Sequence, residues 1–400
     1  MNNYSSKHFV LALAFLAGLT FMQIVGPKRA NYARAAEEAA PSAPVRITLA
    51  AAGDVMMHMP IVESAYDKEA KGYNFAPLFA PVAPYLCGAD FALANLETRL
   101  AAPGRKFSGY PRFNSPAELA EQLRAAGIGL LATANNHSLD MGWEGVDSTL
   151  QALDNCGLAH VGTYRSPEEK ATPLMVDVRG VRLGILNYAG DTNGLPIPAG
   201  KEFAVNLMTP EAIQAEANAA RAMGADLVIA LLHFGNEYSR KPEAGQRELA
   251  KQFIANGVDV IIGSHAHVVQ PIEKITVLRA GKPYQGVVAY SLGNFISNQR
   301  ERYRDSGIIL YLQIEKNGSE TTVTKISYLP VWVQKCGPIN AAGFRILPVH
   351  AQIPAVSDLP LTDKDRARMQ QVWEELTEQL NDQEAGIGAV EGDKGLQMGQ

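Results

Sequence analysis

Two histidines follow an apolar run in the second half of the chain. His265 and His267 come directly after the run 259–263, which ends at Gly263. An apolar run of this length that ends at a glycine predicts a buried strand, and open α/β sheets bind ligands beyond the carboxyl ends of their strands. Side chains two apart share a side of an extended segment, so both imidazoles can converge on one metal ion. The alternative is a coincidental pair of histidines in a turn.

Other predicted strands end in groups of the same chemical kind. These groups are Asp54 after 45–52, Glu97 after 90–95, Asn136 after 128–134 and His233 after 226–232. Hard and borderline metal ions take mixed nitrogen and oxygen ligands. Each residue also has a structural alternative: a turn cap for Asp54 and Asn136, a surface carboxylate for Glu97, and a core histidine for His233. Together, unpaired buried acids and imidazoles would be costly without an ion to satisfy them.

Short apolar runs alternate with helical patterns, which predicts an α/β fold with two packed sheets and helices outside. Helices are expected at 115–126, 142–155, 209–223 and 242–256, the first with Ser115 as N-cap and Glu118 completing a capping box. A hairpin is expected around the Arg179-Gly180 turn. After His267 the pattern turns to strands at 272–278, 286–290, 307–314 and 321–329.

The two ends of the chain differ from the body. Residues 1–35 combine Lys7, a long apolar stretch and Ala33-Arg34-Ala35, which predicts a signal peptide. An uncleaved anchor stays open because the apolar stretch approaches the roughly 20 residues that span a bilayer. Both interpretations predict an exported body, in the periplasm or on the outer face of the inner membrane. Residues 36–44 are expected to be a linker, 45–350 the main domain, and 351–400 a helix at 362–380 followed by a disordered tail.

Charge and cysteine content restrict the function. The 400 residues carry a formal net charge of −5, which argues against nucleic-acid binding because that needs a basic face. Cys87, Cys156 and Cys336 are far apart and odd in number, so neither a zinc knuckle nor a disulfide framework is indicated. We expect them to be buried as small apolar side chains.

The order of the motifs resembles the calcineurin-like metallophosphoesterase superfamily and, within it, the CapA family of poly-γ-glutamate capsule synthesis proteins. The resemblance covers residues 45–333. It is carried by Gly53-Asp54-Val55-Met56, Asn95-Leu96-Glu97, Asn135-Asn136-His137-Ser138-Leu139-Asp140, His233-Phe234-Gly235-Asn236-Glu237-Tyr238, Gly263-Ser264-His265-Ala266-His267 and Ser291-Leu292-Gly293-Asn294-Phe295. It implies a four-layer α/β/β/α sandwich with two mixed sheets.

The resemblance also implies a role for each motif residue. One or two divalent ions (Mn, Fe, Zn or Mg) would be held at the strand ends and would activate water. Asp54 and His267 would hold one ion, Asn136, His233 and His265 the other, and Glu97 would bridge them. His137 would protonate the leaving group and Asp140 would orient its ring. The expected substrate contacts are Arg112, Asn114, Tyr238, Ser291 and Asn294.

This chain departs from the superfamily in its first motif, Asp-x-His, because position 56 is a methionine. Methionine is a poor ligand for hard ions, and His58 is the only nearby imidazole that could replace it. Three functions therefore stay open. They are a metal-dependent hydrolase or transferase of capsule production, a non-catalytic subunit of a membrane capsule-synthesis complex, and a periplasmic phosphoesterase that acts on small phosphate esters.

The expected substrates, an anionic polymer or a phosphate-containing small molecule, would be repelled by an acidic protein unless local cations or metals offset its charge. Arg300, Arg302 and Arg304 follow the last motif and could form a basic patch. The alternative is a solvated loop.

Overall fold

The computed structural model describes residues 43–336, 343–352 and 361–390. The predicted leader at 1–35, most of the predicted linker and residues 391–400 of the tail lie outside these residues. Among the residues that are described, no helix is both long and apolar enough to cross a bilayer.

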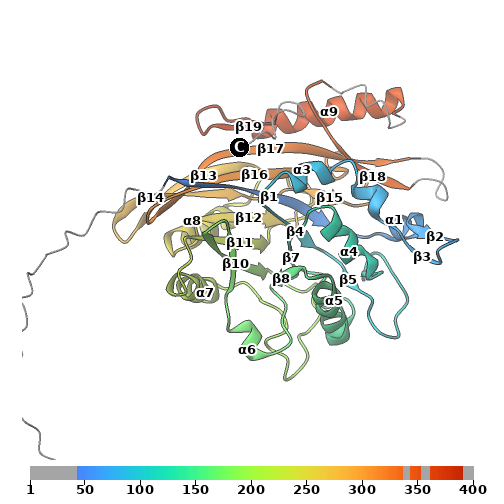
Figure 1. Ribbon diagram of the computed structural model, residues 1–400, viewed down its shortest axis with the longest axis horizontal. Helices are drawn as coiled ribbons and strands as arrows, with labels where there is room; N and C mark the ends of the chain where they lie inside the picture. Colours follow the sequence, from blue (N-terminus) through green and yellow to red (C-terminus); the bar gives the residue numbers. More distant parts are fainter. Residues whose placement is uncertain (1–42, 337–342, 353–360, 391–400) are drawn as a thin grey trace, which may run out of the picture. The chain divides into compact units, whose positions relative to one another are not determined.

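The first sheet is mixed and has the strand order β18-β17-β16-β1-β4-β7-β8, with β15 paired to β1 and β19 paired to β17 (Figure 1). Strands β1, β4, β7 and β8 run parallel, whereas β16, β17 and β18 pair in antiparallel fashion. The bounds are β1 Val45–Val55, β4 Phe91–Leu96, β7 Leu130–Ala132, β8 Ala159–Val161, β15 Asn294–Ile296, β16 Ser306–Asn317, β17 Glu320–Lys335, β18 Phe344–Pro348 and β19 Ile387–Ala389.

The second sheet is also mixed, with the order β13-β14-β12-β11-β10-β9. Its central strands β10, β11, β12 and β14 are parallel, and the edge strands β9 and β13 pair antiparallel to their neighbours. The bounds are β9 Leu174–Val178, β10 Val181–Ala189, β11 Leu227–His233, β12 Val260–Ser264, β13 Ile272–Arg279 and β14 Lys282–Ala289. The predicted hairpin is the β9–β10 pair. Two short pairs lie outside the sheets: β2 (Tyr66–Asp67) with β3 (Gly72–Tyr73), and β5 (Arg99–Leu100) with β6 (Asn114–Ser115).

The two sheets pack face to face, and helices cover their outer faces. Side chains alternate along a strand: Leu49 of β1 and Leu310 of β16 join the apolar layer between the sheets, whereas Ala50 and Ile309 face the helices. The first sheet is covered by α1 Met59–Ser64, α2 Ala76–Phe79, α3 Ala83–Cys87, α4 Glu118–Ala125 and α5 Gly142–Cys156, and the second by α7 Pro210–Ala222 and α8 Ala244–Ala255; α6 spans Pro167–Lys170. The predicted four-layer α/β/β/α sandwich with two mixed sheets is confirmed.

The C-terminal helix α9 (Asp363–Leu380) lies over β17 and β19 (Figure 1). Its start is fixed by a capping box between Thr362 and Asp365, as a helix at 362–380 predicts. Val372 and Leu376 join the same apolar layer as the second sheet, so α9 covers the part of the first sheet that the second sheet leaves open. The helix therefore belongs to the packing of the main domain rather than following it.

The expectation of a disordered tail after this helix is wrong for residues 381–390. Ile387 is buried, and Ile387–Ala389 form β19, which pairs in parallel with β17. Burial of Ile387 and Val390, together with backbone hydrogen bonding to β17, compensates for the polar composition of the segment.

Two further expectations from the sequence are corrected. Ser115 does not cap α4, because it lies in β6 and its Oγ is 2.7 Å from Oγ1 of Thr98. The helix begins three residues later, without a side-chain cap. The cysteines are not buried: Cys87 is exposed, and Cys156 and Cys336 are half-buried.

Candidate functional site

The site begins where β1 meets β15. Asp54 lies beside Asn294 in a parallel pairing, and the backbone N–H of Asp54 donates to the Gly293 carbonyl at 3.0 Å. A Cβ at position 53 would lie 1.9 Å from that carbonyl oxygen, so only glycine permits this approach. Gly53 therefore allows the chain to bring the Asp54 carboxylate and the segment around Asn294 together.

The histidine pair leaves β12 in an unusual backbone conformation. His265 has φ +92° and His267 has φ +56°, a region that side chains other than glycine rarely adopt and that is found at functional sites. Strand alternation therefore no longer applies after Ser264. The two rings lie 6.1 Å apart, and they contact different partners, His267 beside Asp54 and His265 beside His233.

Glu97 lies between the two histidine environments. Its Oε1 is 3.6 Å from Nε2 of His267 and 3.6 Å from Nε2 of His233. Two groups of ligand atoms, each within 4.8 Å of one another, share this carboxylate: Asp54, Glu97 and His267 form the first, and Glu97, His233 and His265 form the second. Glu97 is common to both groups, and the roles of these side chains as metal ligands stay predictions.

The second group also contains an amide. Oδ1 of Asn136 lies 2.9 Å from Nε2 of His233, and Nδ1 of His265 lies 3.1 Å from the same nitrogen. Ser264 Oγ donates to the Leu232 carbonyl at 3.5 Å and lies 2.8 Å from Nδ1 of His233. If Nδ1 of His233 carries the proton, it donates to Oγ of Ser264. The lone pair of Nε2 then faces Oδ1 of Asn136 and Nδ1 of His265, which is the orientation that a metal-ligating imidazole needs.

A divalent cation fits this donor set. Glu97 is fully buried, and its Oε1 has no hydrogen-bond partner among the described residues. Burial raises the pKa of Glu97 well above its ordinary value, and repulsion from Asp54 is the second largest cause. Burial lowers the pKa of His233 well below its ordinary value, and the neighbouring His265 and His267 lower it further. A cation would satisfy the carboxylate oxygen and accept the lone pairs of neutral imidazoles.

Asn95 positions both carboxylates. Its Nδ2 donates to Oδ1 of Asp54 at 2.8 Å and lies 3.3 Å from Oε2 of Glu97. Its Oδ1 accepts from Nδ2 of Asn135 at 3.3 Å. Asn95 had no predicted role, although residues 95 and 97 are two apart at the end of a strand and so share a side.

Arg99 is a second residue that sequence reasoning missed. Its side chain is fully buried and Nη2 donates to the carbonyls of Leu96 and Thr133, at 3.1 and 3.3 Å. Its Nε and Nη1 have no partner among the described residues. Burial lowers the pKa of Arg99 to about 10, while the nearby Asp140 and Glu97 act in the opposite direction. No pattern in the sequence distinguishes this arginine from an exposed one.

His137 and Asp140 form a buried pair next to the donor groups. Nδ1 of His137 lies 2.8 Å from Oδ2 of Asp140, and the same oxygen accepts the backbone N–H of Phe113 at 2.6 Å. The Phe113 ring meets the imidazole edge-on, with centroids 4.7 Å apart. These contacts fix the ring, and Nε2 forms no hydrogen bond with any described residue, which leaves it available for proton transfer.

Met56 stands where the first motif of the superfamily has a histidine, and His58 is the nearby imidazole. Met56 is buried. His58 belongs to neither donor group among the described residues; its Nδ1 instead accepts the backbone N–H of Asn298 at 3.3 Å, and its ring packs against Phe113. Burial lowers the pKa of His58 to about 4. The group around Asp54 therefore has three protein side chains and no replacement for the missing imidazole.

The residues expected to contact substrate fall into two classes. Tyr238 is partly exposed, with its ring 6.0 Å from that of His267 and the Arg304 guanidinium 3.5 Å above it. Arg112 is exposed beside Phe113, and its guanidinium has no ion pair with a described residue. Arg112 is therefore open to a ligand, whereas the hydroxyl of Tyr238 accepts from Nε2 of Gln299 at 3.4 Å.

The other three have structural contacts. Asn114 is fully buried; it accepts the backbone N–H of Ala102 and donates to the carbonyl of Lys106, and its contact with substrate stays a prediction. Ser291 is buried and accepts the backbone N–H of Gly293 at 3.2 Å. Asn294 is buried and its Nδ2 donates to the carbonyls of His267 and Arg304. Asn294 thus ties the histidine loop to the segment that carries the arginines.

A cavity of about 300 Å³ opens beside the second donor group. Asn136, His233 and His265 contribute to its wall, together with the acidic side chains of Asp191 and Glu243. The thirteen described residues that line it include neither lysine nor arginine. An anionic ligand in this cavity would therefore need cations of another kind.

Comparison with known proteins identifies the family. Residues 48–299 match the family model described as "Bacterial capsule synthesis protein PGA_cap". The chain belongs to this family. The matched region contains all the residues of the two donor groups, but it ends before β16 and does not include α9.

Individual relatives agree with the family. The chain is 27% identical over 303 residues to the "Capsule biosynthesis protein CapA" of Bacillus anthracis, covering 73% of this chain and 69% of the relative. It is 29% identical over 278 residues to the "PGA biosynthesis protein CapA" of Bacillus subtilis, covering 67% of each. Among solved structures, the NAD nucleotidase of Haemophilus influenzae aligns with a TM-score of 0.46 and 12% identity, over 88% of this chain and 58% of the nucleotidase.

Proposed function

We propose that this protein is an exported, metal-dependent hydrolase or transferase that acts in the production of a poly-γ-glutamate or related capsule polymer. The observation that carries the catalytic part is the buried Glu97 carboxylate, whose unpartnered oxygen lies between two groups of imidazole and carboxylate donors. Membership of the capsule synthesis family supports the biological context. Export is inferred from the leader pattern at residues 1–35.

The metal would be held by the two donor groups. Asp54, Glu97 and His267 would hold one ion, and Glu97, His233, His265 and Asn136 the other. Divalent ions in such a site activate water and neutralise charge on the oxygens of the attacked centre. This would also explain how a cavity with acidic side chains and no basic ones accepts an anionic substrate.

The protein's own side chains would orient and protonate the substrate. His137 would donate a proton from Nε2 to the leaving group, while Asp140 and Phe113 hold its ring in place. Asn95 would keep the carboxylates of Asp54 and Glu97 apart and aimed at their ligand. Tyr238 and Arg112, which are exposed, would contact parts of the substrate outside the cavity.

Metal analysis of the purified protein tests this proposal. We expect one or two equivalents of a divalent ion, released together with activity by a chelator and lost in Glu97→Gln. A protein that holds no stoichiometric metal, with activity unchanged in Glu97→Gln, would contradict the catalytic proposal. Turnover of a generic aryl phosphate that is lost on chelation would favour a phosphoesterase that acts on small esters.

A non-catalytic role in capsule assembly is the second candidate. It is favoured by the first donor group, which has three side chains and a buried methionine where the superfamily motif has histidine. Complementation separates the two: in cells that lack the gene, His137→Ala should fail to restore capsule if the protein is an enzyme. Full restoration by His137→Ala, with the variant expressed at the normal level, would favour an assembly subunit.

A further inference from the structure

A second, larger cavity lies between the C-terminal helix and the ends of β17 and β18. Its volume is about 840 Å³, within the range of about 300–1,000 Å³ typical of ligand pockets. Its walls come from the segment after β15, from β17 and β18, and from the first half of α9. None of its lining residues belongs to the two donor groups.

The cavity is strongly basic in a protein whose net charge is −5. Six of its thirteen lining residues are lysine or arginine and two are aspartate. The basic residues are Arg300, Arg302, Lys335, Arg345, Lys364 and Arg368. The local charge is therefore opposite to that of the whole chain, and a concave surface of one sign concentrates ligands of the other.

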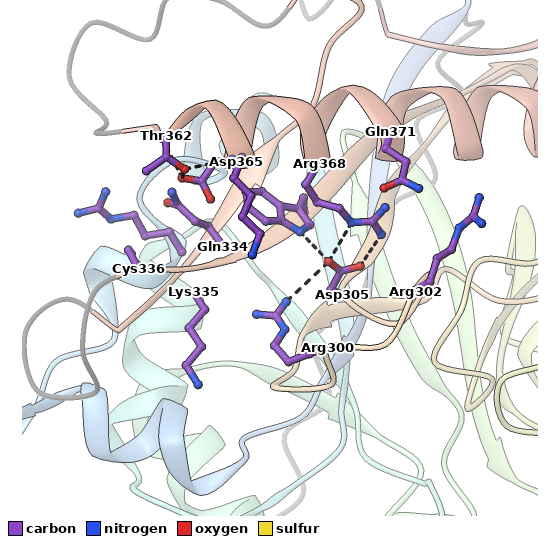
Figure 2. Close-up of a pocket in the computed structure, with 13 residues that line it drawn as sticks. Arg300, Arg302, Asp305, Gln334, Lys335, Cys336, Thr362, Asp365, Arg368 and Gln371 are labelled. Carbon is purple, nitrogen blue, oxygen red and sulfur yellow. Dashed lines mark hydrogen bonds and ion pairs between the residues drawn. The ribbon is translucent and has the colours of Figure 1, made fainter.

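Part of this charge is already neutralised. Figure 2 shows Arg300 and Arg368 directed at Asp305, whose carboxylate is 2.7 Å from Nη2 of Arg368 and 4.0 Å from Arg300. The buried Glu375 pairs with Arg302 at 2.7 Å and with Arg368 at 3.2 Å. These pairs attach α9 to the segment after β15.

Three cations of the cavity form no ion pair within the described part of the chain, although Nζ of Lys335 lies 5.6 Å from the ring centroid of Phe344. Lys335 and Lys364 are exposed and form no ion pair with a described residue, and in Figure 2 the Lys335 side chain extends away from the Asp305 cluster. Nη1 of Arg345 is buried and has no hydrogen-bond partner among the described residues. A buried guanidinium N–H without an acceptor is costly, and an anion would supply the acceptor.

The three cations that have no ion pair with a described residue suit a ligand with several negative charges. They come from the end of β17, from β18 and from the first turn of α9, so a ligand that presents its charges along a chain would meet all three. A chain of carboxylates presents charges at intervals and suits planar guanidinium groups.

The cavity is also connected to the donor groups through a short segment. Asn294 binds the carbonyls of both His267 and Arg304, and the Arg304 guanidinium lies over Tyr238. The same segment then supplies Arg300, Arg302 and Asp305 to the cavity. The three arginines that the sequence suggested as one patch thus serve two places: Arg304 beside the candidate metal site, Arg300 and Arg302 in the basic cavity.

We propose that the basic cavity formed by Lys335, Arg345 and Lys364 is a second binding region for an extended polycarboxylate chain, separate from the metal site. The identity of the ligand as a capsule polymer rests on the proposed function. The cavity would hold one stretch of the polymer by its side-chain carboxylates while another stretch reaches the donor groups.

Binding of a γ-linked glutamate oligomer to the metal-free protein tests this inference without any need for catalysis. The probe is a fluorescently labelled oligomer, and fluorescence anisotropy measures its affinity over a range of salt concentrations. The test variant is Lys335→Gln/Arg345→Gln/Lys364→Gln. The control is Lys68→Gln/Lys282→Gln/Lys325→Gln, which removes three lysines that are exposed elsewhere on the surface and form no ion pair with a described residue, and which changes the net charge equally.

We expect the cavity variant to bind the oligomer about tenfold or more weakly, with a shallower dependence of affinity on salt, because fewer counterions are exchanged. The control should match the wild-type protein. The double variant Lys335→Gln/Lys364→Gln leaves Arg345 in place and should show a smaller loss in the same direction. Thermal unfolding of every variant checks that β18 is undisturbed.

Equal affinity in the cavity and control variants would overturn the inference, and so would the absence of oligomer binding to wild type. A single-stranded nucleic acid of equal length that binds as tightly through the same residues would overturn the assignment to carboxylates. Cavity-dependent binding by a protein that turns over nothing when supplied with metal would contradict the hydrolase proposal alone. Turnover with unchanged affinity in the cavity variant would contradict the cavity inference alone.

Discussion

Nδ1 of His267 lies 3.1 Å from Oδ2 of Asp54, although 213 residues separate the two in the chain. This contact joins β1 of the first sheet to the loop after β12 of the second, so the candidate site depends on the packing of the two sheets. The group formed by these two residues and Glu97 has three side chains, whereas the group around His233 has Asn136 as a fourth. The two halves of the site are unequal.

The inequality predicts different effects of two similar substitutions. His267→Ala should leave about one equivalent of metal bound at the four-donor group, while His265→Ala should weaken that tighter ion itself. Metal content after dialysis, combined with chelator competition, measures both. Equal metal loss in the two variants would show that the site behaves as one unit.

Removal of the shared carboxylate should affect both halves. Glu97→Gln is expected to lower metal affinity by more than the roughly 10–100-fold that supporting residues typically cost, because an amide cannot bridge two cations with a negative charge. Glu144→Gln, at an exposed position in the first turn of α5, is the control. The metal-free Glu97→Gln protein should unfold at the same or a higher denaturant concentration, since it no longer buries an ionisable group. Retention of metal by this variant would exclude a bridging role.

Proton donation by His137 can be separated from metal binding. His137→Ala should lower turnover by roughly 10²–10⁴-fold while metal content stays unchanged. The loss should shrink for substrates whose leaving group is already a weak base, because such groups depart without a proton. Asp140→Asn should act in the same direction by releasing the ring from its carboxylate partner. A loss that is the same for good and poor leaving groups would argue against proton donation.

The buried His58 predicts a change of stability with pH. Because its folded pKa of about 4 lies below the ordinary value of 6.5, its contribution is present above pH 6.5 and is lost as the pH falls towards 4. His58→Gln removes this dependence. The difference in unfolding free energy between wild type and variant should therefore change by up to about 3 kcal/mol over this range. Denaturant unfolding of metal-free protein at several pH values measures it; a constant difference would contradict the assignment.

The strand ends were predictable because they follow from patterns in single segments. Asp54 and Glu97 follow apolar runs of the first sheet, and His233 and the histidine pair follow apolar runs of the second. Within each sheet, parallel strands bring such ends to one edge. Strand order therefore groups the residues of each sheet, whereas the contact between the two groups depends on how the sheets pack. The roles assigned to these residues as metal ligands and catalysts stay predictions, for which the geometry provides the setting.

Other contacts were not visible in the sequence because they depend on tertiary packing. Asn114 and Arg112 are close in sequence, yet one is buried in backbone contacts and the other is exposed. Ser115 has the residue type of a helix cap but forms a strand pair with β5. Ile387 lies in a polar segment, and only the exposed edge of β17 makes a strand there favourable. The buried Arg99 likewise follows no local rule.

Because β16 pairs with β1, a fragment of this protein that ends before β16 would lose one neighbour of β1. The matched family region ends at residue 299, and β16 begins at Ser306. A fragment cut at that boundary would turn the strand that carries Asp54 into an open edge, with eight backbone pairings to β16 lost. Such edges recruit other chains. A fragment that has the candidate site but lacks β16 is therefore expected to self-associate, and β16 covers this edge of β1 in the full chain.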